Sequence, residues 1–141
     1  MIEELAVATF MVLLTAFIHA LGLYALSRAL RLEAMHAGDI PVQPLSPRGM
    51  ILALFLVLGL FALHGIEIWC YAFLYWLVGA LPDLHTSLYF STITYGTVGY
   101  DDEGIASGWR LVAAIEGING IVLLGWSIAF IVTVAARRHQ H

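Results

Sequence analysis

The sequence has no lysine, a single cysteine and little charge of either sign. Charged residues make up 11% of the 141 residues and hydrophobic residues 61%, whereas a soluble domain is roughly half apolar and about a quarter charged. The cysteine, Cys70, has no partner within the chain, which excludes an intrachain disulfide. The composition therefore indicates an integral membrane protein.

Three apolar runs dominate the chain, at Leu5–Leu30, Met50–Leu81 and Trp109–Ala136. A helix that spans a membrane needs about 20 apolar residues, so each run is long enough. The first run does not resemble a signal peptide, because Glu3 and Glu4 precede it and it is too long for the apolar region of one. We expect an all-α membrane protein with three transmembrane helices.

The arginines are placed unevenly. Five of the six lie around the segment that connects the first two apolar runs or at the C-terminal end, namely Arg28, Arg31, Arg48, Arg137 and Arg138. Cytoplasmic loops of membrane proteins collect arginine and lysine. This predicts that residues 31–49 and 137–141 are cytoplasmic, that the N-terminus is outside, and that residues 82–108 are outside or re-enter the membrane.

Residues 84–95 are too few to span a membrane, although they are apolar and aromatic with interspersed hydroxyl groups. Asp83 is placed to cap a short helix there. A short helix ending at Gly96 leaves irregular backbone at membrane depth, which is tolerated only where protein buries it or it lines a water-filled path. This constraint indicates a pore.

Residues 97–100 read Thr-Val-Gly-Tyr and resemble the selectivity filter of potassium channels. The run from Met50 to Ala136 resembles the outer helix, pore helix, filter and inner helix of the potassium-channel superfamily. Tyr89-Phe90-Ser91 before the filter and Trp109-Arg110 after it are similar to small bacterial channels whose pore has two helices.

The resemblance implies a domain plan and an assembly. The expected plan is a peripheral helix at 1–30, a cytoplasmic linker at 31–49, a pore domain at 50–136 (outer helix 50–81, pore helix and filter 84–102, inner helix 109–136) and a cytoplasmic tail at 137–141. One filter per chain cannot surround an ion, so we expect a homotetramer in the inner membrane of a prokaryote. It would conduct monovalent cations passively, potassium above all. We expect no enzymatic activity, no cofactor apart from potassium ions in the filter, and no nucleic-acid partner.

The resemblance also implies roles for the filter residues. Backbone carbonyls of Thr97, Val98, Gly99 and Tyr100 would replace the water shell of potassium, with the Thr97 hydroxyl at the inner end. Gly99 is expected to supply backbone angles that other residues avoid. Tyr100 would pack outward against the pore helix.

Two positions depart from the family pattern, whereas Asp102 matches the acidic residue that follows the filter in the family. Asp101 replaces a glycine, and Gly96 stands where the family commonly has a second threonine at the inner entrance. In a tetramer Asp101 forms a ring of carboxylates at the outer mouth, which concentrates cations. Selectivity either survives this ring or gives way to a non-selective or divalent-blocked cation channel. A third alternative is a non-conducting membrane subunit or sensor.

Ionisable residues within the apolar runs are costly and are candidates for a gate or a support of the filter. Glu67 and Glu116 would accept hydrogen bonds behind the filter or pair with Arg110. Alternatively, His64 and Glu67 share a helix face and form a gate sensitive to protons or metal, or a metal site together with His19. In the third run, Gly120 and Gly125 are either hinges or close packing positions.

Overall fold

The structure is a computed structural model and describes residues 1–37, 46–99 and 103–138. The described residues are helical apart from short connections and contain no strand. Three of the helices are long and apolar enough to cross a membrane. The predicted all-α membrane fold is therefore confirmed.

The described part of the chain forms four α-helices and one short 3₁₀ helix. They are α1 (Ile2–Ala37), α2 (Pro47–Leu77), α3 (Leu84–Tyr95), η1 (Ser107–Trp109) and α4 (Arg110–Arg138). α1 continues to Ala37, beyond the end of the apolar run at Leu30, because polar residues also form helix once a long helix is nucleated.

The ends of α2 differ from those of its apolar run because local capping decides them. Ser46 caps the N-terminus by accepting a hydrogen bond from the Gly49 N–H, and Pro47 occupies the first helical position. At the other end, Gly79 adopts a positive φ of 68°. Its left-handed conformation ends the helix before the apolar run ends. The N–H groups of the next residues, Ala80 and Leu81, turn back to the Tyr75 carbonyl.

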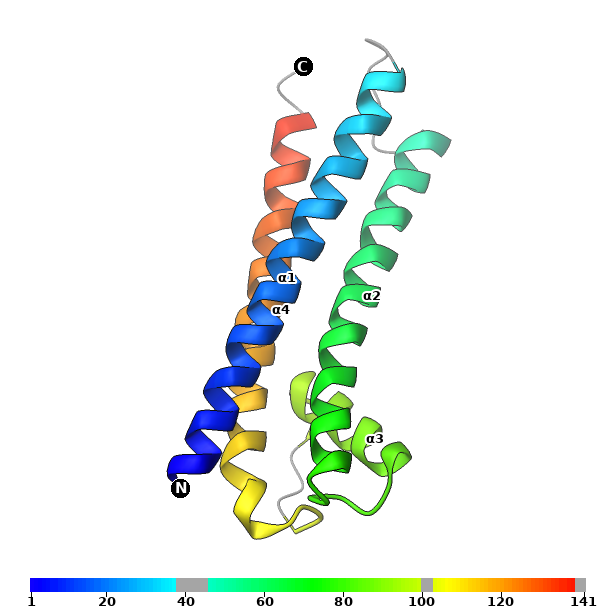
Figure 1. The fold of residues 1–141 in the computed structure, drawn as a ribbon. Coiled ribbons are helices and arrows are strands. Elements are labelled where there is room, and N and C mark those ends of the chain that lie inside the picture. The colour runs from blue at the N-terminus through cyan, green and yellow to red at the C-terminus, as the bar shows by residue number, and fades with distance from the viewer. Residues whose placement is uncertain (38–45, 100–102, 139–141) are drawn as a thin grey trace.

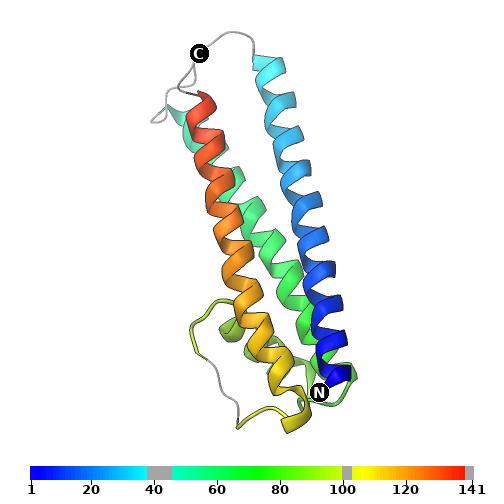
Figure 2. The same ribbon diagram turned by 90° about the vertical axis from the view of Figure 1, so that its left-hand side faces the viewer.

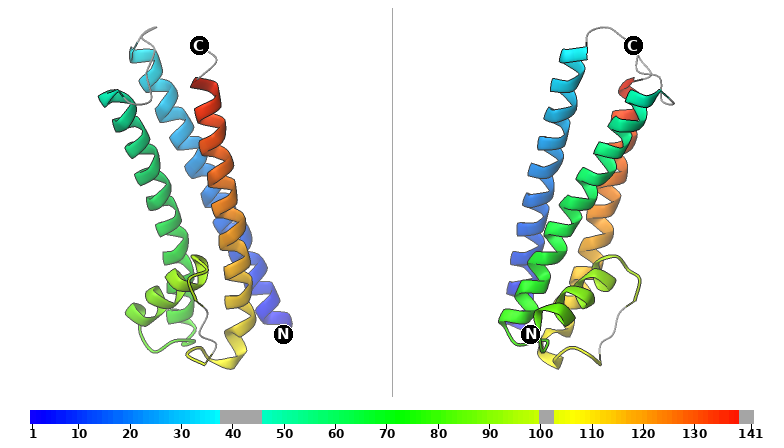
Figure 3. Two further views of the ribbon diagram at one scale, coloured as in Figure 1. Left: turned by 180° about the vertical axis from the view of Figure 1, so that it is seen from behind. Right: turned by 90° about the vertical axis from the view of Figure 1, so that its right-hand side faces the viewer.

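The three long helices run side by side, with α3 tucked beside the ends of α2 and α4 (Figure 1). α2 and α4 each pack against both α1 and α3. α1 covers one side of the α2–α4 pair, and α3 lies on the opposite side (Figures 2 and 3). The N-terminus lies at the same end of the bundle as α3, and α4 ends at the other (Figure 2).

α1 and α2 cross closely through paired small and large residues. A Cβ at Gly22 would lie 2.4 Å from a methyl carbon of Leu63, and one at Gly59 would lie 2.5 Å from a methyl carbon of Leu26. Each glycine thus receives a leucine from the other helix. Glycine at such positions lets membrane helices approach closely.

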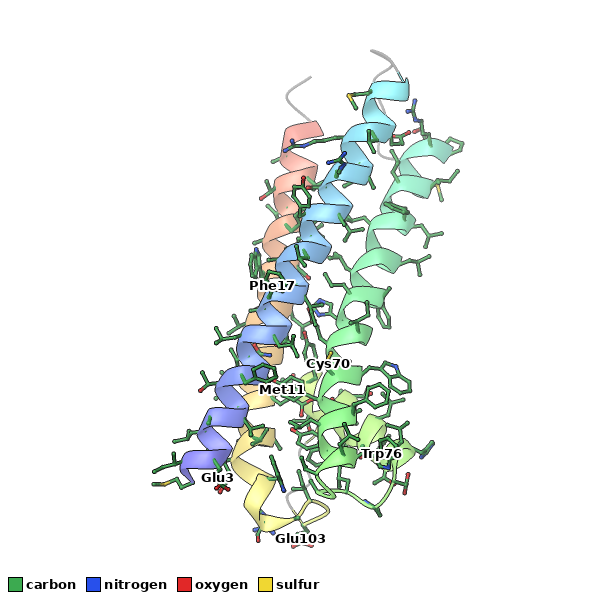
Figure 4. The ribbon with its side chains drawn as sticks, in the orientation of Figure 1. Glu3, Met11, Phe17, Cys70, Trp76 and Glu103 are labelled. Carbon is green, nitrogen blue, oxygen red and sulfur yellow. The ribbon has the colours of Figure 1, made fainter. Side chains whose placement is uncertain are left out.

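α1 buries one face and exposes the other. Met11 is buried in the cluster that α1 shares with α2 and α4, whereas Phe17 is exposed (Figure 4). The buried face also carries polar side chains, Thr15 and His19, both fully buried. These polar groups contribute to the site described next.

Candidate ion pathway and its supporting side chains

α3 is a short helix with a defined start. Asp83 is its N-cap: one carboxylate oxygen accepts from the Thr86 N–H at 2.8 Å and the other from the Thr86 hydroxyl at 2.8 Å. These two hydrogen bonds hold the pKa of Asp83 below its usual value. The capping role expected for Asp83 is therefore seen in the structure.

The Asp83 cap predicts a small, specific dependence of stability on pH. Because the folded pKa is lowered, the cap stabilises α3 above the unfolded pKa of about 3.9, and this stability is lost as the pH falls through the folded pKa. Asp83→Asn should retain the cap but remove this dependence, whereas Asp83→Ala should be less stable at neutral pH. Thermal unfolding between about pH 6 and pH 3 measures both effects, with the asparagine variant as the control. Equal acid sensitivity of the wild type and Asp83→Asn would contradict this role.

α3 ends deep between its neighbours. The Tyr95 side chain reaches Glu67, ten residues before the end of α2, and the Tyr95 backbone lies against Gly120, ten residues after the start of α4. At 1.5 Å per residue, both positions lie about 15 Å from the ends of those helices. The backbone that follows Tyr95 therefore begins inside the bundle, beside the parts of α2 and α4 that are long and apolar enough to cross a membrane.

The segment after α3 is non-helical and open to its surroundings in a single chain. Residues 96–99 are all exposed, with Val98 at 82%. Further on, Ile105 is buried, and the Ala106 N–H donates to the Ala80 carbonyl at 3.1 Å, which fixes the return of the chain. Tyr100 of the expected filter, and Asp101 and Asp102 of the expected outer mouth, lie outside the described residues.

The backbone conformation of this segment differs from our expectation at Gly99. Positive φ falls on Thr97, at 57°, and not on Gly99. The N–H groups of Thr97 and Val98 turn back to the carbonyls of Thr94 and Ile93, at 3.1 and 2.9 Å, with Gly96 as the C-cap. This is the left-handed cap that satisfies the last carbonyls of a helix, and it explains why Thr97 takes the left-handed conformation.

Glu116 of α4 joins three helices from a fully buried position. Its carboxylate accepts a hydrogen bond from the Tyr75 hydroxyl of α2 at 2.6 Å and from the Ser91 hydroxyl of α3 at 2.5 Å. The Ser91 hydroxyl also lies 3.0 Å from the Ile68 carbonyl. Glu116 thus holds the middle of α3 between α2 and α4.

Glu67 of α2 is fully buried and holds the end of α3. It accepts a short hydrogen bond from the Tyr95 hydroxyl. His19 Nδ1 lies 2.9 Å from one carboxylate oxygen, and His64 Nδ1 lies 3.1 Å from the other. The structure therefore brings together the three residues that the sequence suggested as a metal site.

Ser127 of α4 closes this group into a ring. Its hydroxyl oxygen lies 2.9 Å from His64 Nε2 and 3.4 Å from His19 Nε2. Each imidazole therefore has one nitrogen toward Glu67 and the other toward Ser127. We call His19, His64, Glu67 and Ser127 the His–Glu ring; it contains residues of α1, α2 and α4.

The two glycines expected as hinges or packing positions have different surroundings. A Cβ at Gly120 would lie 2.2 Å from the Tyr95 carbonyl oxygen, so α4 approaches the backbone of α3 closely there. A Cβ at Gly125 would meet no atom within 4 Å. Close packing therefore explains glycine at position 120 and does not explain it at position 125.

Sequence reasoning missed several partners of these side chains. Asn119 of α4 donates hydrogen bonds to the Thr15 hydroxyl at 2.8 Å and the Tyr71 hydroxyl at 3.2 Å, which ties α1 to α4 and α2. It is the one asparagine of the chain and interrupts an apolar run. That isolation was an available signal for a buried polar partner. Tyr75, Ser91 and Tyr95 carried no comparable signal, because aromatic and hydroxyl residues are frequent in that region.

Comparison with known proteins gives one family. A family model described as an ion channel matches residues 63–137, just over half of the chain. The match includes the second half of α2, all of α3, and α4 up to residue 137. No curated protein and no solved structure matched the chain.

Proposed function

Because the chain belongs to the ion channel family, we propose that it forms a homotetramer that conducts potassium through the Thr97–Tyr100 backbone. The observation that carries this proposal is the exposed, non-helical segment 96–99. It begins about 15 Å from the end of the bundle where α2 ends and α4 begins. Such backbone is tolerated at membrane depth only beside protein or water. Placed around a four-fold axis, it would have both.

The direction of α3 supports a cation pathway. A helix carries roughly half a negative charge at its C-terminal end, and α3 ends immediately before the proposed filter. This end would favour a cation at the inner entrance, next to Gly96 and Thr97. Carbonyls of residues 97–100 would then replace its water in several adjacent sites, which allows ions to move by mutual displacement.

The surface of α4 also supports an assembly. Its buried face carries Glu116, Asn119 and Leu123, whereas large apolar residues on the remaining surface are exposed in the single chain: Ile118, Ile121, Val122, Ile128 and Val132. In the proposed tetramer, part of this surface lines the inner pore or meets neighbouring copies, and the rest meets lipid. We further propose that residue 1 is outside and that the opposite end of the bundle is cytoplasmic, where five of the six arginines lie: Arg28, Arg31, Arg48, Arg137 and Arg138.

The reversal potential of the purified protein in a planar bilayer tests the proposal. With potassium on one side and an equal concentration of sodium on the other, we expect a strongly potassium-directed value, because the filter carbonyls compensate potassium for its lost water better than sodium. Native mass spectrometry of the same sample should give four chains.

The Asp101→Gly variant, which restores the family pattern, serves as the matched comparison. If both proteins conduct with a reversal potential near zero, the channel is non-selective and the proposal is wrong. If only the variant selects potassium, the carboxylate ring at Asp101 determines permeation. A wild-type tetramer that stays silent while the variant conducts would favour the non-conducting subunit.

A further inference from the structure

The His–Glu ring does not line the conduction path proposed above, and it is built from side chains that bind metals. Two imidazoles and one carboxylate converge on one buried place, and their nearest ligand atoms lie within 4.8 Å of one another. His19 and Glu67 are fully buried, and 13% of the His64 side chain is exposed. The ring lies between α1 and the α2–α4 pair. It therefore includes a residue of α1, a helix that lies wholly outside the matched residues 63–137.

The ring has one proton fewer than its hydrogen-bond contacts need. It contains four contacts: two between Glu67 and the Nδ1 atoms, and two between Ser127 and the Nε2 atoms. A hydrogen bond at every contact needs four protons. A carboxylate brings none, two neutral imidazoles bring one each, and the serine hydroxyl brings one. One contact therefore lacks a proton when Glu67 is ionised and both histidines are neutral.

We propose that His19, His64 and Glu67 bind a divalent transition-metal ion of the zinc class. Two histidines and one glutamate are a ligand set that zinc uses, with imidazole nitrogens and a carboxylate oxygen as donors. Magnesium and calcium prefer oxygen donors alone, so this set favours zinc and its neighbours in the transition series. The Tyr95 hydroxyl, 2.9 Å from His64 Nδ1, offers a further oxygen at the same place.

A metal at this position removes the shortage of protons. Ligation through both Nδ1 atoms places the ring protons on both Nε2 atoms. The Ser127 oxygen has two lone pairs and faces both Nε2 atoms, so it can accept from each of them. Metal-bound histidines generally donate their second ring N–H to such a partner. Ser127 therefore serves as the outer support of the site.

The position of the site links it to the end of α3. Glu67 would bind the metal with the same carboxylate that accepts the Tyr95 hydroxyl. An ion here would also join α1 to α2 directly. We therefore expect bound zinc to raise the midpoint of thermal unfolding, because a ligand that binds only the folded state stabilises it.

Cobalt titration of the full-length protein in detergent, after removal of metals with a chelator, tests the proposal. The protein for this titration, the background protein, carries His36→Gln, His139→Gln and His141→Gln, so that its remaining histidines are His19, His64 and His85. We expect one cobalt ion per chain, with the intense visible absorption of a low-coordinate site, and displacement of cobalt by zinc. The Trp126 ring lies 5.3 Å from the His19 ring, so bound cobalt should also quench the fluorescence of Trp126. The contribution of Trp126 is the part of the fluorescence that is lost in the Trp126→Phe variant.

Matched variants decide the outcome. His64→Gln and His19→Gln should each abolish the absorption and the quenching, whereas His85→Gln, at an exposed position of α3, should change neither. Ser127→Ala should weaken binding by about 10-fold or more, because it removes the outer support. Thermal unfolding of each variant without metal identifies any variant that fails to fold. If a histidine variant does not fold, cobalt binding by Ser127→Ala is compared with that of the background protein instead.

Two results would overturn the proposal. One is the absence of stoichiometric cobalt or zinc binding in the folded background protein. The other is binding that survives both His64→Gln and Ser127→Ala. A pH-dependent change of Trp126 fluorescence without metal binding would show that the ring takes a proton instead. The titration does not depend on potassium selectivity, so its failure leaves the conduction proposal standing.

Discussion

Replacing Gly120 with alanine is expected to push α4 away from the end of α3 and to abolish most of the channel current. The new Cβ would lie 2.2 Å from the Tyr95 carbonyl oxygen and 3.0 Å from its carbonyl carbon. Backbone atoms at a capped helix end cannot rotate aside as a side chain does. Overpacking commonly costs about 1–3 kcal/mol, and we expect the upper end of this range because the helix itself must move.

Gly125→Ala is the control, because a Cβ there meets nothing within 4 Å inside the chain. We expect its free energy of unfolding to stay within about 0.5 kcal/mol of the wild type or to rise slightly. Thermal unfolding in detergent measures stability, and ion flux into liposomes measures conduction. Wild-type stability and flux in Gly120→Ala would show that the contact between Gly120 and Tyr95 is unimportant.

Replacing Glu67 with alanine is expected to cause the second large loss. The carboxylate is fully buried and faces His19, His64 and Tyr95, each of which would lose one of its hydrogen-bond partners. Removing one member of a buried charged network commonly costs about 3–5 kcal/mol. The Tyr95 hydroxyl would lose the acceptor that holds the end of α3, so we expect conduction to fail as well.

A surface ion pair between the same two helices provides the control. Arg48 of α2 lies 2.6 Å from Glu33 of α1, and about a third of each side chain is exposed. Exposed pairs contribute up to about 1 kcal/mol, so Glu33→Ala should reduce stability far less than Glu67→Ala. Glu67→Gln keeps an acceptor for Tyr95 and should fall between them. The same midpoint of unfolding for Glu33→Ala and Glu67→Ala would contradict the supporting role of Glu67.

The helices could be predicted from the sequence because a membrane span must be apolar whatever it packs against. The short helix 84–95 could be predicted for a related reason: its length excludes a span, and Asp83 and Gly96 mark its ends. Both arguments depend only on neighbouring residues. The true ends of α2, at Pro47 and Leu77, depend on Ser46 and Gly79, whose capping roles the apolar pattern does not reveal.

The partners of the buried polar residues could be predicted only in part. His64 and Glu67 share a helix face by their spacing, but the contact of His19 with Glu67 depends on how α1 is rotated against α2. The expectation for Gly99 differed from the structure because the N–H groups after a helix choose among several carbonyls. The sequence shows which residues tolerate the left-handed conformation, not which one the hydrogen bonds require.

The buried polar contacts also constrain the order in which the chain can fold. The Tyr95–Glu67 and His19–Glu67 contacts join residues 28 and 48 positions apart, whereas Ser127–His64 and Asn119–Thr15 join residues 63 and 104 positions apart. Contacts between distant residues form late, because closing a long loop costs entropy before the contact repays it. Synthesis from the N-terminus strengthens this order.

Glu67 therefore finds its histidine partner on α1 as soon as the first two helices are inserted, before α4 has been made. A charged residue at the centre of an isolated inserted helix costs about 2.5–3.5 kcal/mol, and this early contact offsets part of that cost for α2. Asn119, Glu116 and Ser127 arrive later and meet partners already in place. We infer that α1 assists the insertion of α2, and that the end of α3 becomes fixed only when α4 completes the bundle.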